Sequence, residues 1–215
     1  MEGSDPFAKD WERMLRKQLA GRGITCPRLL SAMGQVPRHQ FVAEGQQHLA
    51  YQDQALAIDC GQTISQPYIV ASMSEALKLS ADHLVLEIGT GSGYQAAVLA
   101  ELAAAVYSIE IVTQLEERAR DTLAELGYAN VQVKQGDGYA GWPEQAPFDA
   151  IMVTAAPDHI PQPLVDQLAV GGRLIIPVGQ NRQTLTLLTR TEDGVEQRQM
   201  LPVLFVPMTG QAERR

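Results

Sequence analysis

Residues 85–95, Val-Leu-Glu-Ile-Gly-Thr-Gly-Ser-Gly-Tyr-Gln, decide the fold of this chain. The stretch begins as a short apolar run with an acid near its end, passes through three glycines, and continues as a helix-like segment. This order of strand, glycine turn and helix start is typical of a nucleotide-cofactor site. Its spacing is Glu-x-Gly-x-Gly-x-Gly, and Tyr94 stands where a dinucleotide fingerprint has its third small residue. A dinucleotide cofactor is therefore disfavoured, although a glycine turn alone indicates no particular ligand.

The chain after the glycine turn alternates between strand-like and helix-like segments. Apolar runs of strand length lie at 106–109, 131–133, 149–153 and 171–177, and helical patterns lie at 95–102, 113–126 and 163–170. Such alternation predicts an α/β fold with a doubly wound, mostly parallel Rossmann-like sheet that helices cover on both faces. The runs 184–189 and 195–201 flank Glu-Asp-Gly and predict an antiparallel strand pair that completes the sheet near the C-terminus.

Acidic residues end or follow three of the predicted strands. Parallel sheets bind ligands at the carboxyl ends of their strands, which is where Glu87, Glu110 and Asp137 fall. Glu110 lies about twenty residues after the glycine turn, where a nucleoside-binding fold places an acid for the ribose hydroxyls. The Asp137 carboxylate, in a Gly-Asp-Gly turn, can accept a hydrogen bond from an adenine amino group. The alternative for Glu110 and Asp137 is a solvated strand end or a turn-stabilising acid.

Length and composition favour one compact unit. The chain has 215 residues, of which 45% are hydrophobic and 20% are charged, and no linker, repeat or low-complexity segment requires a division. We expect one structural domain in two parts. Residues 1–80 are predicted to form an N-terminal helical extension with the substrate and cofactor loop, and residues 81–215 to form the cofactor-binding core.

Charge, hydropathy and cysteine content exclude several classes of protein. A formal net charge of −8 disfavours nucleic acids and anionic membranes as partners, because phosphate contacts need clustered Lys and Arg. No uncharged apolar run approaches the roughly twenty residues of a membrane span, and the start resembles no secretory signal. Cys26 and Cys60 are expected to be reduced thiols in a cytoplasmic protein, with a disulfide between them as the alternative. The four histidines lack metal-ligand spacing, so no metal is expected.

Several separate motifs, in a consistent order, carry a resemblance to one family. They are Met-Leu-Arg-Lys-Gln-Leu-Ala-Gly-Arg-Gly-Ile (14–24), Val-Pro-Arg-His-Gln-Phe-Val (36–42), Ala-Tyr-Gln-Asp-Gln-Ala-Leu (50–56), Gly-Gln-Thr-Ile-Ser-Gln-Pro-Tyr (61–68), Glu-Ile-Gly-Thr-Gly-Ser-Gly-Tyr (87–94), Gly-Asp-Gly (136–138) and Phe-Val-Pro-Met-Thr-Gly (205–210). Over about residues 14–210 the chain closely resembles the bacterial type of protein-L-isoaspartate O-methyltransferase, within the superfamily of methyltransferases that use S-adenosylmethionine.

The resemblance implies a cofactor, a reaction and a class of substrate. Members of this family transfer a methyl group from S-adenosyl-L-methionine to the α-carboxylate of L-isoaspartyl residues in damaged proteins and peptides, leaving S-adenosyl-L-homocysteine. The ester collapses to a succinimide, and hydrolysis returns part of it to aspartate. A carboxylate is already ionised at neutral pH, so no general base is required. We therefore expect catalysis to come mostly from holding an oxygen in line with the methyl group in a dry site, in a monomeric enzyme.

The same resemblance assigns residues to the site. Ser65 matches the serine that lies beside the methyl donor and the substrate carboxylate, so it is the expected catalytic residue, and its hydroxyl would orient an oxygen. From the residues alone, Ser65 as the cap of a helix that begins at Pro67 is the alternative. The expected cofactor-binding residues are Gly61, Gln62, Thr63, Glu87, Gly89, Thr90, Gly91, Ser92, Gly93, Glu110, Asp137, Gly138 and Thr209.

One stretch departs from the family pattern, and two other functions remain open. Ala57 and Asp59 stand where the family usually has proline and glycine. A negative charge at Asp59 should weaken binding of a carboxylate substrate unless the side chain points to solvent, so Asp59→Gly is expected to lower the Michaelis constant. The alternatives are a methyltransferase with another acceptor and a non-catalytic relative that binds the cofactor. The first is disfavoured by Val-Thr-Ala-Ala-Pro (153–157), which lacks the Asn/Asp-Pro-Pro-aromatic sequence that grips an amino nitrogen. The second is disfavoured by retention of Ser65 within Gln-Thr-Ile-Ser-Gln-Pro.

Overall fold

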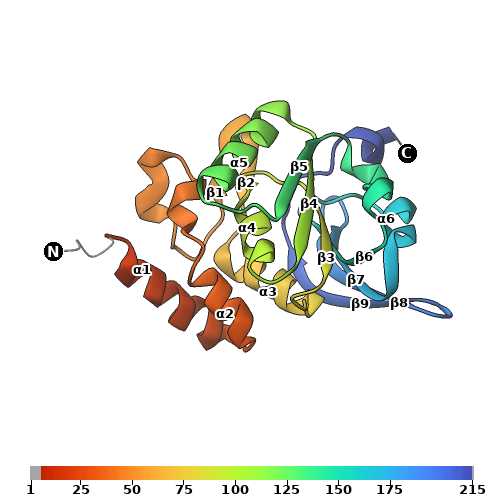
Figure 1. Ribbon diagram of the computed structural model, residues 1–215, viewed down its shortest axis with the longest axis horizontal. Coiled ribbons are helices and arrows are strands. Elements are labelled where there is room, and N and C mark those ends of the chain that lie inside the picture. Colours follow the sequence, from red (N-terminus) through yellow and green to blue (C-terminus); the bar gives the residue numbers. More distant parts are fainter. Residues whose placement is uncertain (1–5, 215) are drawn as a thin grey trace.

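A seven-stranded sheet forms the centre of the computed structural model, which describes residues 6–214 (Figure 1). The strand order is β5-β4-β3-β6-β7-β8-β9. The strands are β3 (Leu84–Ile88), β4 (Ala105–Glu110), β5 (Val131–Gln135), β6 (Phe148–Val153), β7 (Leu168–Val178), β8 (Gln183–Thr191) and β9 (Gly194–Val203). Strands β3 to β7 pair in parallel, whereas β8 and β9 are antiparallel. The predicted doubly wound, mostly parallel sheet with an antiparallel C-terminal pair is confirmed.

Helices precede the sheet and alternate with its strands. The α-helices are α1 (Ala8–Arg13), α2 (Pro27–Met33), α3 (Pro67–Leu77), α4 (Tyr94–Ala100), α5 (Thr113–Glu125) and α6 (Gln162–Asp166). A π-helix, η1 (Met14–Leu19), continues α1. The 3-10 helices are η2 (Ala20–Arg22), η3 (Arg38–Phe41), η4 (Glu44–Leu49), η5 (Asp59–Gly61), η6 (Gly138–Ala140), η7 (Pro143–Gln145) and η8 (Gly210–Arg214). A small hairpin, β1 (Leu56–Ala57) with β2 (Thr63–Ile64), lies outside the main sheet. Every helix among residues 6–214 is too short or too polar to cross a membrane.

Successive side chains of the central strands enter two apolar clusters on opposite faces of the sheet. Val85 and Val106 belong to the cluster that contains buried residues of α2, α3 and α4. Leu86 and Ile151 belong to the other cluster, together with Leu164 of α6. Because neighbouring residues of a strand point to opposite faces, an unbroken apolar run buries both faces at once. The apolar runs at 85–88, 106–109, 149–153 and 171–177 therefore lie in interior strands, whereas the run at 131–133 lies in the edge strand β5.

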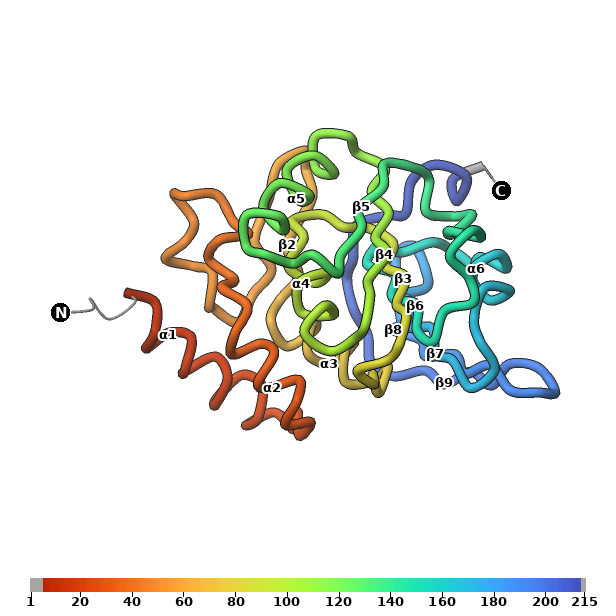
Figure 2. Tube along the Cα trace, viewed as in Figure 1, coloured from red at the N-terminus to blue at the C-terminus, as the bar shows by residue number. Residues whose placement is uncertain are grey.

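The N-terminal helices pack beside the sheet as part of the same core. Figure 2 shows the chain from α1 to α2 passing beside α3 and α4 before it reaches the β1–β2 hairpin. The Trp11 indole donates to the Met33 carbonyl oxygen at 2.8 Å, and Met14 shares a cluster with Leu99 of α4. The helical extension that the sequence predicts therefore shares its core with the residues that follow it.

One predicted helix is wrong at its C-terminal end. The pattern over 163–170 predicts a helix, but α6 ends at Asp166 and β7 begins at Leu168, which pairs with Phe148 of β6. Gly171 adopts a positive φ of 83° within β7, where the register of the β6–β7 pair shifts. A short apolar run fits a buried strand as well as a helix, so periodicity could not place this boundary.

Candidate functional site

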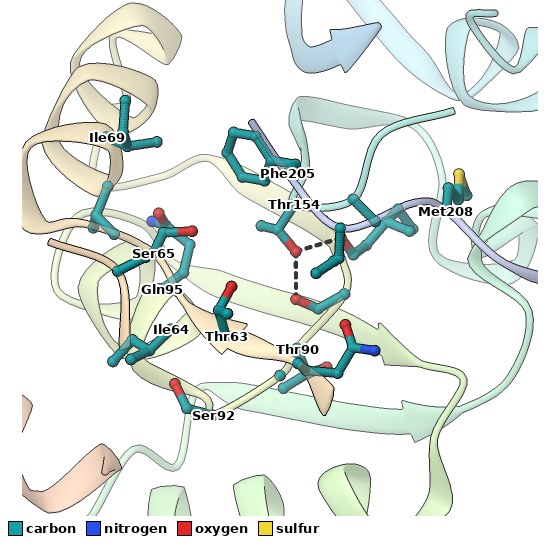
Figure 3. A pocket seen from close by; sticks show the side chains of 18 of the residues that line it. Thr63, Ile64, Ser65, Ile69, Thr90, Ser92, Gln95, Thr154, Phe205 and Met208 are labelled. Carbon is teal, nitrogen blue, oxygen red and sulfur yellow. Dashed lines mark hydrogen bonds between the residues drawn. The ribbon is translucent and has the colours of Figure 1, made fainter. Parts of the chain in front are cut away.

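A cavity of about 590 Å³ opens at the carboxyl ends of β3, β4 and β6. Its walls come from residues 62–66, 88–92, 110–112, 154–155 and 202–209, together with parts of α3 and α4. Figure 3 shows Thr63 and Ser65, Thr90 and Ser92, and Thr154 around this cavity, each set from a different segment. The sheet edge predicted to bind a ligand is therefore the edge that carries the cavity.

The glycine turn needs its glycines for two separate reasons. Gly89, Gly91 and Gly93 have φ values of 94°, 54° and 88°, a region that residues with a side chain rarely adopt. A Cβ at Gly89 would overlap Thr154 Oγ1, which hydrogen bonds to the carbonyl oxygen of Gly89 at 2.6 Å. Gly93 lies outside the cavity lining and faces Leu123 of α5, where it permits close helix packing. Two of the glycines thus expose backbone to the cavity, and the third positions α4.

Glu110 lies in the cavity wall and also holds the glycine turn in shape. It ends β4, is buried, and accepts hydrogen bonds from the Gly91 amide at 2.8 Å and the Val112 amide at 3.0 Å. An ionised carboxylate has about four acceptor positions, so the two oxygens retain capacity for a ligand. Of the acids expected at the site, Glu110 is the one that lines the cavity.

Glu87 lies behind the cavity wall. Its side chain is fully buried and is not part of the cavity lining. The Ser108 hydroxyl donates to Glu87 Oε2 at 2.5 Å, and the Ser108 and Thr90 hydroxyl oxygens lie 2.6 Å apart, so a hydrogen-bond chain connects Glu87 to the lining residue Thr90. Burial raises the pKa of Glu87 to about 8, although the Ser108 hydrogen bond opposes this and the Glu110 charge adds to it. Oε1 of Glu87 has no partner among the described residues.

Asp137 stabilises a turn in this structure. Its Oδ1 accepts from the Tyr139 amide at 2.9 Å and its Oδ2 accepts from the Gln211 amide at 2.8 Å. Its neighbour Gly138 lines the cavity, and a Cβ at Gly138 would overlap Ile88. The turn-stabilising alternative therefore describes Asp137 as it stands, and its expected contact with adenine stays a prediction.

Ser65 lines the cavity immediately before α3. The N-cap of that helix is Gln66, without a side-chain hydrogen bond, so the capping alternative for Ser65 is wrong. Among the described residues the Ser65 hydroxyl has no hydrogen-bond partner, whereas its carbonyl oxygen accepts from Arg38 Nη2 at 2.7 Å. The backbone of Ser65 is thus fixed while its hydroxyl remains available to a ligand.

The remaining expected residues divide between the cavity wall and its surroundings. Gln62, Thr63, Thr90, Ser92 and Thr209 line the cavity. Gly61 lies outside the lining, in the exposed η5 turn with a φ of 70°.

The structure adds cavity residues that motif reasoning did not single out. They include Tyr94 and Gln95 of α4, Thr154 after β6, and Phe205 near the C-terminus. Thr154 could have been found, because it follows a parallel strand at its carboxyl end. Phe205 begins the Phe-Val-Pro-Met-Thr-Gly motif, but only the path of the chain after β9 brings its side chain to the site.

Asp59 forms an ion pair with Arg118 of α5 and is exposed, with 64% of its side-chain surface accessible. It is not part of the cavity lining.

Because Arg118 balances the charge of Asp59 and solvent screens it, Asp59→Gly should change the Michaelis constant for an isoaspartyl peptide by less than about twofold. Steady-state kinetics of Asp59→Gly and Arg118→Ala check this. A large fall in the Michaelis constant of Asp59→Gly would mean that the Asp59 carboxylate repels the substrate although it lies outside the cavity lining.

Both cysteines are free in the structure. Cys26 is partly buried and Cys60 is exposed, in the η5 turn with a φ of 58°. No disulfide joins these two cysteines in the structure, and their reduced state in the protein stays a prediction.

Comparison with known proteins identifies the family. The model of the protein-L-isoaspartate(D-aspartate) O-methyltransferase family matches residues 9–213. A protein-L-isoaspartate O-methyltransferase of a Synechococcus species is 58% identical over 96% of this chain and 88% of its own length. One from Gloeobacter violaceus is also 58% identical, over 91% of this chain and 97% of its own.

Solved structures agree with the sequence relatives. A protein-L-isoaspartate O-methyltransferase structure matches with a TM-score of 0.86 and 30% identity, over 94% of this chain and 67% of that one. A Plasmodium falciparum structure described as such an enzyme, in complex with S-adenosyl-L-homocysteine, matches with a TM-score of 0.80 and 26% identity, over 96% and 99% of the two chains. With a family match over almost its whole length, this chain belongs to the protein-L-isoaspartate(D-aspartate) O-methyltransferase family.

Proposed function

We propose that this chain repairs damaged proteins by transferring a methyl group from S-adenosylmethionine to the α-carboxylate of L-isoaspartyl residues. The observation that carries the proposal is that Ser65 and the glycine turn with Glu110 line one cavity. A donor held by the turn and a carboxylate held at Ser65 would therefore share one enclosed space.

The residues present fit the cofactor. Cβ atoms at Gly89 and Gly138 would overlap Thr154 and Ile88, so both positions require glycine, and their backbone lines the cavity. We assign the ribose hydroxyls to Glu110, because its carboxylate is in the lining and keeps free acceptor positions. Gln62, Thr63, Thr90, Ser92 and Thr209 complete the polar part of the wall. The bound cofactor supplies an activated methyl group on a sulfonium, which carries its own leaving group.

The lining suits a reaction that needs no proton transfer. Among the described residues that line the cavity, Glu110 and Tyr94 are the only ionisable side chains, and burial raises the pKa of Tyr94, which keeps it neutral. The substrate carboxylate is ionised at neutral pH and attacks the methyl carbon directly, forming a C–O bond as the methyl–sulfur bond breaks. The Ser65 hydroxyl donates a hydrogen bond that orients the attacking carboxylate. Ile64, Ile69 and Phe205 are apolar parts of the wall that exclude water. Holding the two reactants in line can lower a barrier by up to roughly 7–11 kcal/mol.

Transfer of labelled methyl groups tests the function itself. An isoaspartyl peptide should accept label, and its normal aspartyl twin should not. Label in neither peptide, from folded protein that binds the cofactor, would favour the non-catalytic relative. Label only in an unrelated acceptor would favour a different methyltransferase. We also propose that the enzyme is a monomer, which sedimentation checks, and that it is cytoplasmic, a compartment in which free cysteines such as Cys26 and Cys60 are usual.

Loss of the Ser65 hydroxyl should slow catalysis. Ser65→Ala is expected to lower kcat by about 10- to 100-fold, because a hydrogen bond to a charged group contributes roughly 1.5–3 kcal/mol. Affinity for S-adenosylhomocysteine, measured by calorimetry, should change little. Ser72→Ala is the matched control, since Ser72 lies on α3 outside this cavity and donates to the Tyr68 carbonyl oxygen. An unchanged kcat for Ser65→Ala would remove Ser65 from the mechanism.

A further inference from the structure

Arg38 is a fully buried guanidinium behind the wall of the cavity. It begins η3, and its side chain has an exposed fraction of 0%. Nε donates to the Ala50 carbonyl oxygen and Nη2 to the Ser65 carbonyl oxygen, each at 2.7 Å. The guanidinium carbon lies 4.7 Å from the centre of the Tyr94 ring. Since Ser65 and Tyr94 both line the cavity, the cation is one side-chain layer away from it.

The charge of Arg38 has no acidic partner. Among residues 6–214, no Asp or Glu forms a hydrogen bond or ion pair with the guanidinium, whose hydrogen bonds go to neutral carbonyl oxygens. Its Nη1 and the Tyr94 hydroxyl are both buried and make no hydrogen bond within 3.5 Å, and the neutral Tyr94 side chain is the group that the guanidinium interacts with. Burial lowers the pKa of Arg38, yet arginine stays protonated in proteins. Buried charges are costly unless an opposite charge balances them, so this one needs a counter-charge.

A ligand carboxylate at Ser65 would be that counter-charge. We infer that Arg38 is a positioning residue, which fixes the backbone of Ser65 and attracts the substrate carboxylate through the charge of its buried guanidinium. This inference rests on the proposed function, because it takes the α-carboxylate of an isoaspartyl residue as the occupant of the cavity beside Ser65. A charge in a poorly solvated wall is screened less than a surface charge. The affinity of the site should therefore depend on the ionisation of its ligand.

The alternative is that Arg38 is only a structural link between the segments around Ala50 and Ser65. The chain offers a matched control for that role. Arg28 also joins two backbone carbonyls, donating to Leu79 O at 3.1 Å and to Leu102 O at 2.9 Å, and it is remote from the cavity lining. A purely structural arginine should affect charged and neutral ligands alike.

A comparison of two ligands in three proteins tests the inference. The ligands are an isoaspartyl peptide and its twin with a neutral α-carboxamide, and their dissociation constants are measured by calorimetry with S-adenosylhomocysteine present. The unmodified protein should bind the carboxylate at least about tenfold more tightly than the amide. Arg38→Met should remove most of that preference and raise KM more than it lowers kcat, whereas Arg28→Met should leave the preference intact.

Each outcome is decisive. Equal affinity for the two peptides in the unmodified protein overturns the inference, whether or not Arg38→Met folds. An equal loss of affinity for both ligands in Arg38→Met also overturns it, because that is the result expected of a structural link. Arg38→Gln serves as a second neutral variant, and Arg38→Lys, which keeps the charge, should restore much of the preference. Failure of the unmodified protein to methylate the isoaspartyl peptide would instead contradict the proposed function, since these affinities require no turnover.

Discussion

Gly89→Ala is expected to abolish measurable binding of S-adenosylhomocysteine and to lower the free energy of unfolding by about 2–5 kcal/mol. Part of the loss of stability comes from the φ of 94° at Gly89, where a residue with a side chain is strained. The rest comes from overlap of the new methyl group with Thr154 Oγ1, which cannot move freely because it hydrogen bonds to the carbonyl oxygens of Ile88 and Gly89. Calorimetry and urea unfolding measure the two effects.

Two further variants separate strain from overlap. Gly127 has a similar φ of 83°, but a Cβ at this position would meet nothing within 4 Å, so Gly127→Ala reports the backbone strain alone. Gly127→Ala should lower the free energy of unfolding by about 1–2 kcal/mol and leave the affinity for S-adenosylhomocysteine unchanged. Adding Thr154→Ala to Gly89→Ala removes the overlap and should recover part of the stability. Unfolding curves of Gly89→Ala and Gly127→Ala that coincide would contradict the role assigned to Thr154.

Glu87→Gln is expected to make the protein more stable than the unmodified chain at pH 8, with the difference shrinking toward pH 5. The pKa of Glu87 is raised from 4.5 to about 8 by burial, so the folded protein keeps the proton that the unfolded chain releases. The contribution of Glu87 to stability is therefore complete below pH 4.5 and is lost as the pH rises to about 8. At about 1.4 kcal/mol per pH unit, the loss reaches at most about 5 kcal/mol. Glutamine has the same shape, accepts the Ser108 hydrogen bond and does not ionise.

Urea unfolding between pH 5 and pH 8 measures this difference. The curve of stability against pH should fall more steeply for the unmodified protein than for Glu87→Gln. Ser108→Ala removes the hydrogen bond that favours the ionised form of Glu87. The free energy of unfolding of this variant should therefore continue to fall at higher pH than that of the unmodified protein. Parallel curves for the unmodified protein and Glu87→Gln would show that Glu87 does not retain its proton on folding.

Local patterns were sufficient for most of the fold. The apolar runs became β3 to β7. In the interior strands they carry residues for both faces of the sheet, as Val85 and Leu86 do, whereas the edge strand β5 supplies Val131 and Val133 to one face only. The glycine turn was predictable because three positive φ angles in five residues leave little choice but glycine. The end of α6 was not predictable from local patterns, because Leu168 is in a strand only through its pairing with Phe148.

The sequence by itself determined the sheet, the glycine turn and the family motifs, since these depend on local conformation and on residues near one another in the chain. Only the tertiary structure decided what surrounds each acid and cation. Burial raises the pKa of Glu87 against the opposing hydrogen bond from Ser108, and Arg118 balances the charge of Asp59. Arg38 meets Ser65 across 27 positions of the chain. The energy of a charge depends on its solvation and its neighbours in space, and neither is encoded within one short stretch of sequence.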